Sequence, residues 1–474
     1  MCPVLHWAGQ TDEAGRLALD LALELGEEGV ARSLVEHQAN LNQTDGEGRA
    51  ALHLAIQRSD PAAALFLLSC GAQVNLPTLT ERRGPLHLLA ALSDPTLCPV
   101  LEAALTRGAD TDLQDLQGET ALSLAIQQDN REVFTRLVGA GANLELTSTA
   151  GRPALYHALS SPVEGGLGEE GYAGLLLRAG ADSGAVCGPG GDTLLHCLAT
   201  QGREEAGLFL LGEGAAVGPL NRRGETVLHL ACQSGLATLA TALMVAGADP
   251  NIQTNSGAGE VWRQTALHLA MVAGQEAVVS CLLEFTQPSP ALSTKTVDLD
   301  LRNSEEVTPL ALALALGRTH LAQQMVEAGA DVNVTDRAGL PLLLKAIKEG
   351  EVGAATFLLS HGADLALRSP QGETALELAV VAGAGGVVEK LCGAGADPLA
   401  SSTGEPVLWS ALCQEDQQQG QDLASTLVRH GADPDSWAAG PGGCEQESVT
   451  FINSEIFRLI LANCSKRGKN SASV

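Results

Sequence analysis

Aromatic residues are scarce in this chain: 7 Phe, 4 Trp and 2 Tyr make up only 3% of its 474 residues. Because aromatic side chains dominate the packing of large cores, a single conventional large core is not expected. Glycine is abundant instead, with 53 residues, and 45% of the chain is apolar. The length alone would suggest about three domains. The even spread of glycines and short aliphatic residues indicates one repetitive architecture.

Basic residues are scarce as well. The chain has 28 Lys and Arg against 56 Asp and Glu, which gives a formal net charge of −28. Nucleic acid is therefore not expected as a partner, because binding phosphates requires a basic surface. Direct insertion into a membrane is not expected either. The acidic excess favours basic protein partners, and their association should weaken as salt rises.

Closely paired cysteines and long apolar runs are missing. The eleven cysteines are an odd number, and no two are separated by only two residues. Neither a disulfide framework nor a paired-thiolate zinc site is predicted, and we expect free, mostly buried thiols. No apolar run approaches the about 18 residues that span a bilayer, and residues 1–10 do not resemble a signal peptide. The expected location is the cytoplasm.

The sequence does contain an internal repeat. Segments such as Thr226-Val-Leu-His-Leu-Ala231 and Thr265-Ala-Leu-His-Leu-Ala270 share one pattern, and the first leucine of each copy recurs in steps of 32 to 43 residues, most often 33. A Gly-Ala pair closes most copies, and in seven of ten cases its glycine lies 19 residues after the leucine. Two markers in one register identify a repeat protein. The twelve anchor leucines are Leu19, Leu52, Leu86, Leu122, Leu155, Leu195, Leu228, Leu267, Leu310, Leu343, Leu376 and Leu408.

The copy that begins at Thr226 shows what each unit should be. Thr226 can cap a helix whose apolar face contains Leu228, and Gly235 can end that helix in a left-handed turn. A second helix is predicted over residues 236–246, closed by Gly247. Neither helix can bury its apolar face alone, so stability must come from stacking the units.

These motifs resemble ankyrin repeats, which share the Thr-x-Leu-His-x-Ala core, the 33-residue step and the Gly-Ala-Asp-x-Asn close. The resemblance covers residues 17–436 and implies an all-α fold: an ankyrin-repeat solenoid of about twelve helix-turn-helix repeats with projecting β-turn fingers. Residues 1–16 are predicted to be an N-terminal extension, and 437–474 a divergent tail or cap. Insertions are expected near residues 93–100, 161–172, 253–263, 286–302 and 413–421.

Within that family, the chain resembles the rabankyrin group of endosomal proteins, which carry BTB, ankyrin and FYVE regions. The resemblance rests on residues 17–23 and 424–431, the irregular insertions, and Ser436-Trp437 followed by residues 440–444. No BTB or FYVE module is recognisable, so phosphoinositide binding is not expected. We interpret the sequence as a truncated or alternatively ended relative. The resemblance implies a scaffold in endosomal membrane traffic, recruited to early endosomes, with a Rab-family GTPase and endocytic adaptors as partners.

Candidate catalytic motifs are absent or explained by the repeat. His53, His87, His196, His229 and His268 recur at one place, where ankyrin-like folds bond the ring to the capping threonine and a neighbouring turn, so a structural role is favoured over metal binding. Residues 166–171 match a dinucleotide-binding pattern, but no strand precedes them and two glutamates would repel a pyrophosphate. No cofactor and no enzymatic activity are predicted. The alternative is a regulatory ankyrin subunit of an enzyme or signalling complex without an endosomal role.

A partner-binding site is predicted at the insertion before the eighth repeat. Twenty residues separate Gly247 from Leu267, where 13 to 15 are usual. Insertions on one face of a solenoid commonly line its binding side. Trp262 would be a good interface anchor there, with Glu260 and Arg263 as its polar rim. A disordered loop without function is the alternative.

The family resemblance also implies a modification. Ankyrin-like turns of the form Asp-Val-Asn are recurrent substrates of an asparagine hydroxylase, and this form occurs at Asn333. We therefore expect hydroxylation first at Asn333, then at Asn75 and Asn251.

Overall fold

The computed structural model describes residues 18–161, 167–255, 263–287, 295–400, 402, 407–412, 414 and 416–432. Within them, twenty-four α-helices form twelve consecutive pairs, as expected for an all-α ankyrin-repeat fold. We call the first helix of each pair the inner helix, the second the outer helix, and the loop before each inner helix the finger. The predicted extension (1–16) and tail (437–474) lie outside the described residues.

The helices are short and evenly spaced. The inner helices are α1 (Ala18–Glu24), α3 (Ala51–Gln57), α5 (Pro85–Ala91), α7 (Ala121–Gln127), α9 (Ala154–Ser160), α11 (Leu194–Thr200), α13 (Val227–Ser234), α15 (Ala266–Ala273), α17 (Pro309–Ala315), α19 (Leu342–Lys348), α21 (Ala375–Val381) and α23 (Val407–Leu412). The outer helices are α2 (Glu28–Glu36), α4 (Pro61–Ser69), α6 (Cys98–Thr106), α8 (Arg131–Gly139), α10 (Tyr172–Arg178), α12 (Glu204–Gly212), α14 (Ala237–Val245), α16 (Glu276–Leu283), α18 (Thr319–Glu327), α20 (Val352–Ser360), α22 (Gly385–Gly393) and α24 (Gln417–Arg429). A 3₁₀ turn, η2 (Pro95–Leu97), precedes α6, and strands β1 (Val186–Cys187) and β2 (Asp192–Thr193) form the finger before α11.

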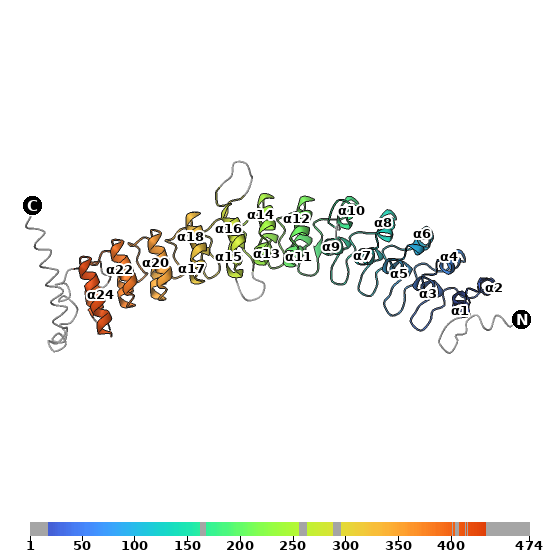
Figure 1. The fold of residues 1–474 in the computed structure, drawn as a ribbon, viewed down its shortest axis with the longest axis horizontal. Coiled ribbons are helices and arrows are strands. Elements are labelled where there is room, and N and C mark those ends of the chain that lie inside the picture. Colours follow the sequence, from blue (N-terminus) through green and yellow to red (C-terminus); the bar gives the residue numbers. More distant parts are fainter. Residues whose placement is uncertain are drawn as a thin grey trace, which may run out of the picture. The chain divides into compact units, whose positions relative to one another are not determined.

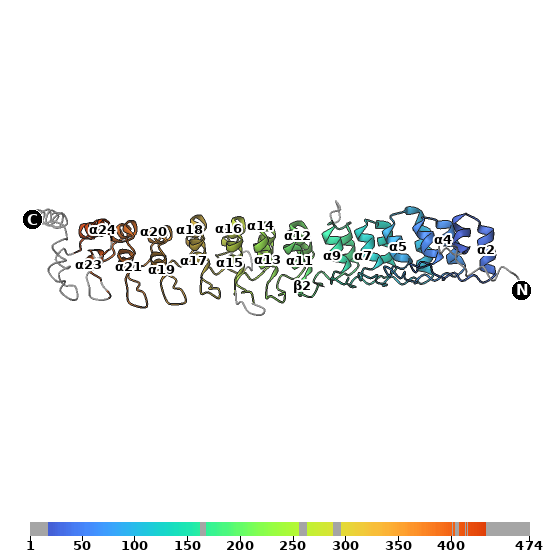
Figure 2. The same ribbon diagram turned by 90° about the horizontal axis from the view of Figure 1, so that it is seen from below.

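The chain divides into two units, residues 1–243 and 244–474, with the boundary inside α14. In the first unit the inner helices α1, α3, α5, α7, α9, α11 and α13 pack on one another in chain order. In the second unit α15 packs on α17, α19 on α21 and α21 on α23, while α20, α22 and α24 pack in the outer layer. Within each unit the helices form two layers, and the fingers project on one side of them (Figures 1 and 2).

The caps and the core follow the repeat pattern. The Thr226 hydroxyl accepts a hydrogen bond from the His229 N–H at the start of α13, and Gly235 ends that helix with a φ of 79°. The anchor Leu228 is fully buried. The following helix, predicted over 236–246, spans Ala237–Val245. Both local predictions for this copy are confirmed.

The recurrent histidines fasten their own inner helices to the next finger. In His268, Nδ1 accepts the backbone N–H of Thr265 at 3.4 Å, and Nε2 donates to the Val307 carbonyl at 3.0 Å. His53, His87 and His196 make the same two bonds in their own copies. One ring nitrogen accepts and the other donates, which is the pattern of a neutral imidazole. Burial lowers the pKa of all four rings, in keeping with the structural role predicted for them.

Candidate functional site

Side chains at the base of each finger reach across to the next finger. We call these hydrogen bonds the base ladder. The Asn75 Oδ1 accepts the backbone N–H of Asp110 at 2.8 Å, and Asn333 accepts that of Asp364 at the same distance. The other acceptors in the series are Asn42, Asp112, Glu145, Asn251 and Asp300. The series is interrupted at Gly184, Gly218 and Ala366, which have no polar side chain to offer.

In the first unit the finger tips are joined as well. The backbone N–H of Leu79 donates to the Glu47 carbonyl at 3.0 Å, and that of Leu116 to the Glu81 carbonyl at 2.9 Å. Three further bonds, from Thr149, Gly188 and Arg222 to the preceding finger, continue this tip ladder. The fingers of this unit therefore form a connected backbone surface, on which exposed side chains are held in fixed positions.

Two leucines project from adjacent tips of this surface. Leu79 is 73% exposed and Leu116 is 56% exposed. We call them the finger leucines. Their neighbours Glu47 and Glu81 are also largely exposed, and Arg83 pairs with Glu81 at 2.9 Å. Large apolar side chains held on a rigid, solvated edge with charges around them have the composition of a protein-binding site.

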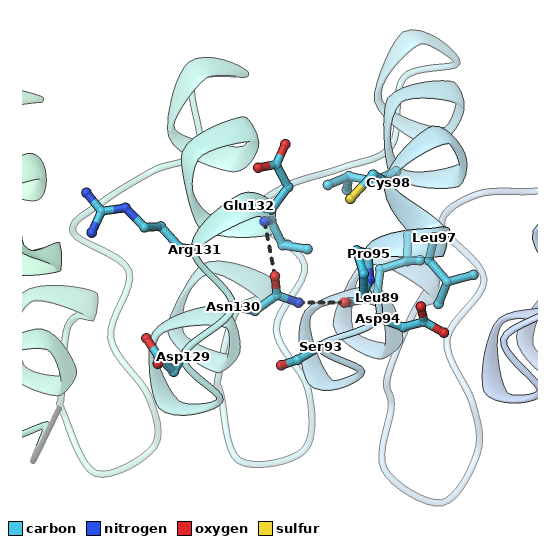
Figure 3. A pocket seen from close by; sticks show the side chains of 12 residues that line it. Leu89, Ser93, Asp94, Pro95, Leu97, Cys98, Asp129, Asn130, Arg131 and Glu132 are labelled. Atoms are coloured by element: carbon cyan, nitrogen blue, oxygen red, sulfur yellow. Dashed lines mark hydrogen bonds between the residues drawn. The ribbon is translucent and has the colours of Figure 1, made fainter.

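A pocket of about 200 Å³ lies away from the fingers, where inner helices turn into outer helices in the third and fourth copies (Figure 3). The buried Asn130 supports it, since its Nδ2 donates to the Leu89 carbonyl and its Oδ1 accepts the Val133 N–H, both at 3.3 Å. Arg131 points away and donates to the Glu170 carbonyl. The carboxylates among its lining residues are Asp94, Asp129 and Glu132. The pocket can hold one apolar side chain beside a basic group.

The predicted insertion site is only partly described. Trp262 and Glu260 lie outside the described residues, and Arg263 is exposed. The residues on either side of the insertion belong to the same finger. They are joined by a hydrogen bond in which the backbone N–H of Thr254 donates to the Gln264 carbonyl at 3.0 Å. The other long insertion lies between the end of α16 and Lys295.

The three asparagines predicted as modification sites are all in the base ladder. Asn75 is exposed, while Asn251 and Asn333 are half-buried. The Asn251 Oδ1 accepts the Asp298 N–H at 2.9 Å, so each of the three carboxamides is held by the next finger.

The finger leucines were missed by sequence reasoning, although a signal was available. Other copies place Gly46, Thr149 or Arg222 where Leu79 and Leu116 stand. A large apolar residue at a turn position is the anomaly that could have identified them. In the parts of the chain that the structure describes, no group of three or more His, Cys, Asp or Glu side chains could hold a metal ion. No helix in those parts is both long and apolar enough to span a bilayer.

Comparison with known proteins places these features in context. A family model of ankyrin repeats matches residues 4–78, 168–254, 235–336 and 317–402. Rabankyrin-5 from Homo sapiens is 38% identical over 383 residues, which cover 72% of this chain and 33% of that protein, and the Mus musculus protein gives the same values. The match thus spans about a third of the length of these relatives.

More distant matches share only part of the array. Neurogenic locus notch homolog protein 1 from Xenopus laevis is 34% identical over 170 residues, which cover 36% of this chain and 6% of that protein. The crystal structure of the ankyrin repeat domain of Bcl-3, a member of the IκB protein family, aligns with a TM-score of 0.43 and 27% identity over 49% of this chain and 99% of its own.

Proposed function

Because this chain belongs to the ankyrin-repeat family, we propose that it is a non-catalytic scaffold that binds protein partners through the fingers of its first unit. The observation that carries the proposal is the pair of exposed leucines on adjacent, hydrogen-bonded tips. Burying apolar side chains that are already held in place adds affinity with little further ordering of the chain. The acidic character of the chain favours partners with basic residues around an apolar segment.

The finer proposal concerns the cellular role. The relative with 38% identity is named Rabankyrin-5, which supports a role in endosomal membrane traffic and endocytosis. The partners would be a Rab-family GTPase and endocytic adaptors, with the protein in the cytoplasm and recruited to early endosomes. Trp262, with Glu260 and Arg263, would supply a second contact in the insertion before α15.

A second candidate function is a regulatory ankyrin subunit of a signalling complex without an endosomal role. The observation that favours it is the match to the notch homolog proteins, which covers about a third of the chain. The two candidates differ in the partners that they require, so a binding experiment separates them.

The test uses the full chain, immobilised and exposed to a panel of Rab-family GTPases loaded with GDP or a non-hydrolysable GTP analogue. We expect GTP-dependent capture, and the double variant Leu79→Ser, Leu116→Ser should weaken it by about tenfold or more. Val381→Ser is the matched control, because Val381 is 64% exposed but lies on a helix of the second unit.

Each outcome decides between the proposals. Capture of no member of the panel would contradict the Rab proposal and leave the signalling candidate in place. Capture that is equally strong in the double variant and in the Val381→Ser control would contradict the finger leucines as the binding site.

A further inference from the structure

The base ladder of the second unit lacks a rung at Ala366. At the rung before it, the Asn333 Oδ1 accepts the Asp364 N–H at 2.8 Å. One copy further along the chain, Ala366 stands at the acceptor position, and the N–H to be bound is that of Asp397. A methyl group cannot accept a hydrogen bond, so the chain does not make this rung itself.

The backbone at the missing rung has the same local turns as the backbone at a rung that is made. The Asp364 Oδ1 accepts the Ala366 N–H at 2.8 Å, and the Asp397 Oδ1 accepts the N–H two residues further on at 2.9 Å. At a rung that is made, the Asp110 Oδ1 accepts the Asp112 N–H in the same way at 3.0 Å. The Asp397 N–H is therefore positioned as that of Asp110 is, but none of the described residues accepts it.

The rungs formed by asparagine show which chemical group fits this place. The Asn75 Oδ1 accepts the Asp110 N–H at 2.8 Å, and its Nδ2 donates to the Gly108 carbonyl at 3.3 Å. Asn251 makes the same two bonds to the finger after it, at 2.9 and 2.8 Å. At the missing rung the counterpart of Gly108 is Gly395, whose carbonyl accepts no hydrogen bond from the described residues. A carboxamide would therefore find one donor and one acceptor there.

A pocket of about 590 Å³ lies at the missing rung. Ala366, Gly395 and Asp397 are among its lining residues, together with the buried Ala375 and Leu376. Pockets that bind small ligands have volumes of about 300–1,000 Å³ and combine apolar walls with a few polar groups. This pocket therefore has room for one side chain and the main chain on either side of it.

The polar groups of the pocket favour a carboxamide over a carboxylate. Asp300 does form a rung in the same unit, since it accepts the Asp331 N–H at 3.0 Å, but a carboxylate has no donor for a carbonyl. Asp364 and Asp397 both line the pocket and would repel an acid. The guanidinium of Arg368 donates to a carbonyl of its own finger at 2.9 Å.

We propose that this pocket binds a primary carboxamide, supplied by an asparagine side chain on a loop of a protein partner. The asparagine Oδ1 accepts the Asp397 N–H, its Nδ2 donates to the Gly395 carbonyl, and the two bonds complete the base ladder from outside. Both backbone groups are already in place, so little ordering of this chain opposes binding. The site lies in the second unit and does not depend on the finger leucines.

The test follows the backbone amide of Asp397 by NMR in the full chain, isotope-labelled at aspartate. The variant Asp397→Asn identifies the signal by its absence. The probe is N-acetyl-asparagine N-methylamide, whose side chain is its only primary carboxamide. The control probe is the leucine compound, which has the same branched shape without the polar atoms. The asparagine probe should shift the signal with a dissociation constant of about 1–10 mM, and the leucine probe should bind about tenfold more weakly or less.

A variant that makes the rung itself should block the site. In Ala366→Asn the new carboxamide takes the place of the probe, so the Asp397 signal should be shifted without any probe and the response to the probe should be lost. Ala338→Asn is the matched control, because Ala338 is exposed on a finger of the same unit and is not among the lining residues. It should respond as the wild type does. Circular dichroism checks that each variant is folded.

Three results would overturn the proposal. The first is an equal response of the Asp397 signal to both probes, or no response to either, because the pocket would then not recognise a carboxamide. The second is an unchanged response in Ala366→Asn, which would place the bound probe elsewhere. The third is tighter binding of free asparagine than of the blocked probe. That result would identify a small molecule as the ligand, because a residue within a protein has neither the free amino group nor the free carboxylate.

Discussion

Replacing Gly151 by alanine should open the contact between two neighbouring fingers of the first unit. Gly151 has a φ of +72°, and an added Cβ would lie 2.3 Å from the Gly188 nitrogen and 2.4 Å from its Cα. The left-handed conformation costs an L-residue about 1–2 kcal/mol. Losing the bond from the Gly188 N–H adds about 1 kcal/mol. The finger should therefore be destabilised locally by about 2–3 kcal/mol.

The matched control is Gly141→Ala. Gly141 has a similar φ of +82°, but no heavy atom lies within 4 Å of the position that its Cβ would take. This variant has the conformational cost without the steric clash. It should therefore be destabilised by only about 1–2 kcal/mol, at the end of α8.

Hydrogen exchange is the suitable assay, because long repeat arrays often do not unfold in a single step and a global free energy is then poorly defined. Exchange at the Gly188 amide should accelerate by about 30- to 150-fold in Gly151→Ala. It should stay at the wild-type rate in Gly141→Ala. The Gly188 amide could instead exchange at the same rate in both variants. In that case the close approach of the two fingers does not stabilise this part of the fold, and the tip ladder contributes nothing measurable.

Three further predictions concern pH, binding and modification. Burial lowers the folded-state pKa of four histidines below the ordinary value of 6.5, so the unfolded chain binds more protons than the folded chain as the pH falls through 6.5. The urea midpoint should therefore fall between pH 7.5 and pH 5.5, and His268→Gln should reduce this fall. Trp262→Ala should weaken partner capture without lowering the melting temperature, and unchanged capture would count against the insertion. Peptide mass spectrometry from oxygenated cells should find hydroxylation at Asn333 first; complete coverage without it would remove that proposal.

The local structure was predictable because its causes are local. The cap at Thr226 and the stop at Gly235 depend on a hydroxyl and a left-handed glycine within one helix, and both occur where the repeat pattern predicts them. The burial of Leu228 follows in the same way from helical periodicity.

The candidate sites were less predictable because they form between segments. Leu79 is held in place by the preceding finger, through a bond to the Glu47 carbonyl that no period in the sequence reveals. The residues that sequence analysis proposed instead, Trp262 and Glu260, lie outside the described residues.

The interruption of the base ladder at Gly184 has a consequence for cooperativity. Elsewhere in the first unit, neighbouring fingers are linked both at the base and at the tip, but after Gly184 the base bond is missing. The two fingers there are linked by the tip bond from Arg222 to the Gly190 carbonyl and by Asn221, whose Nδ2 donates to the Asp192 carboxylate at 2.9 Å. In a repeat array, coupling between neighbours decides how many copies open together. The Asn221–Asp192 bond is worth about 1 kcal/mol and compensates for the missing base bond, so the copies on either side of Gly184 should open as separate segments once this bond is removed. A partner that bound both fingers would couple the two copies in the same way.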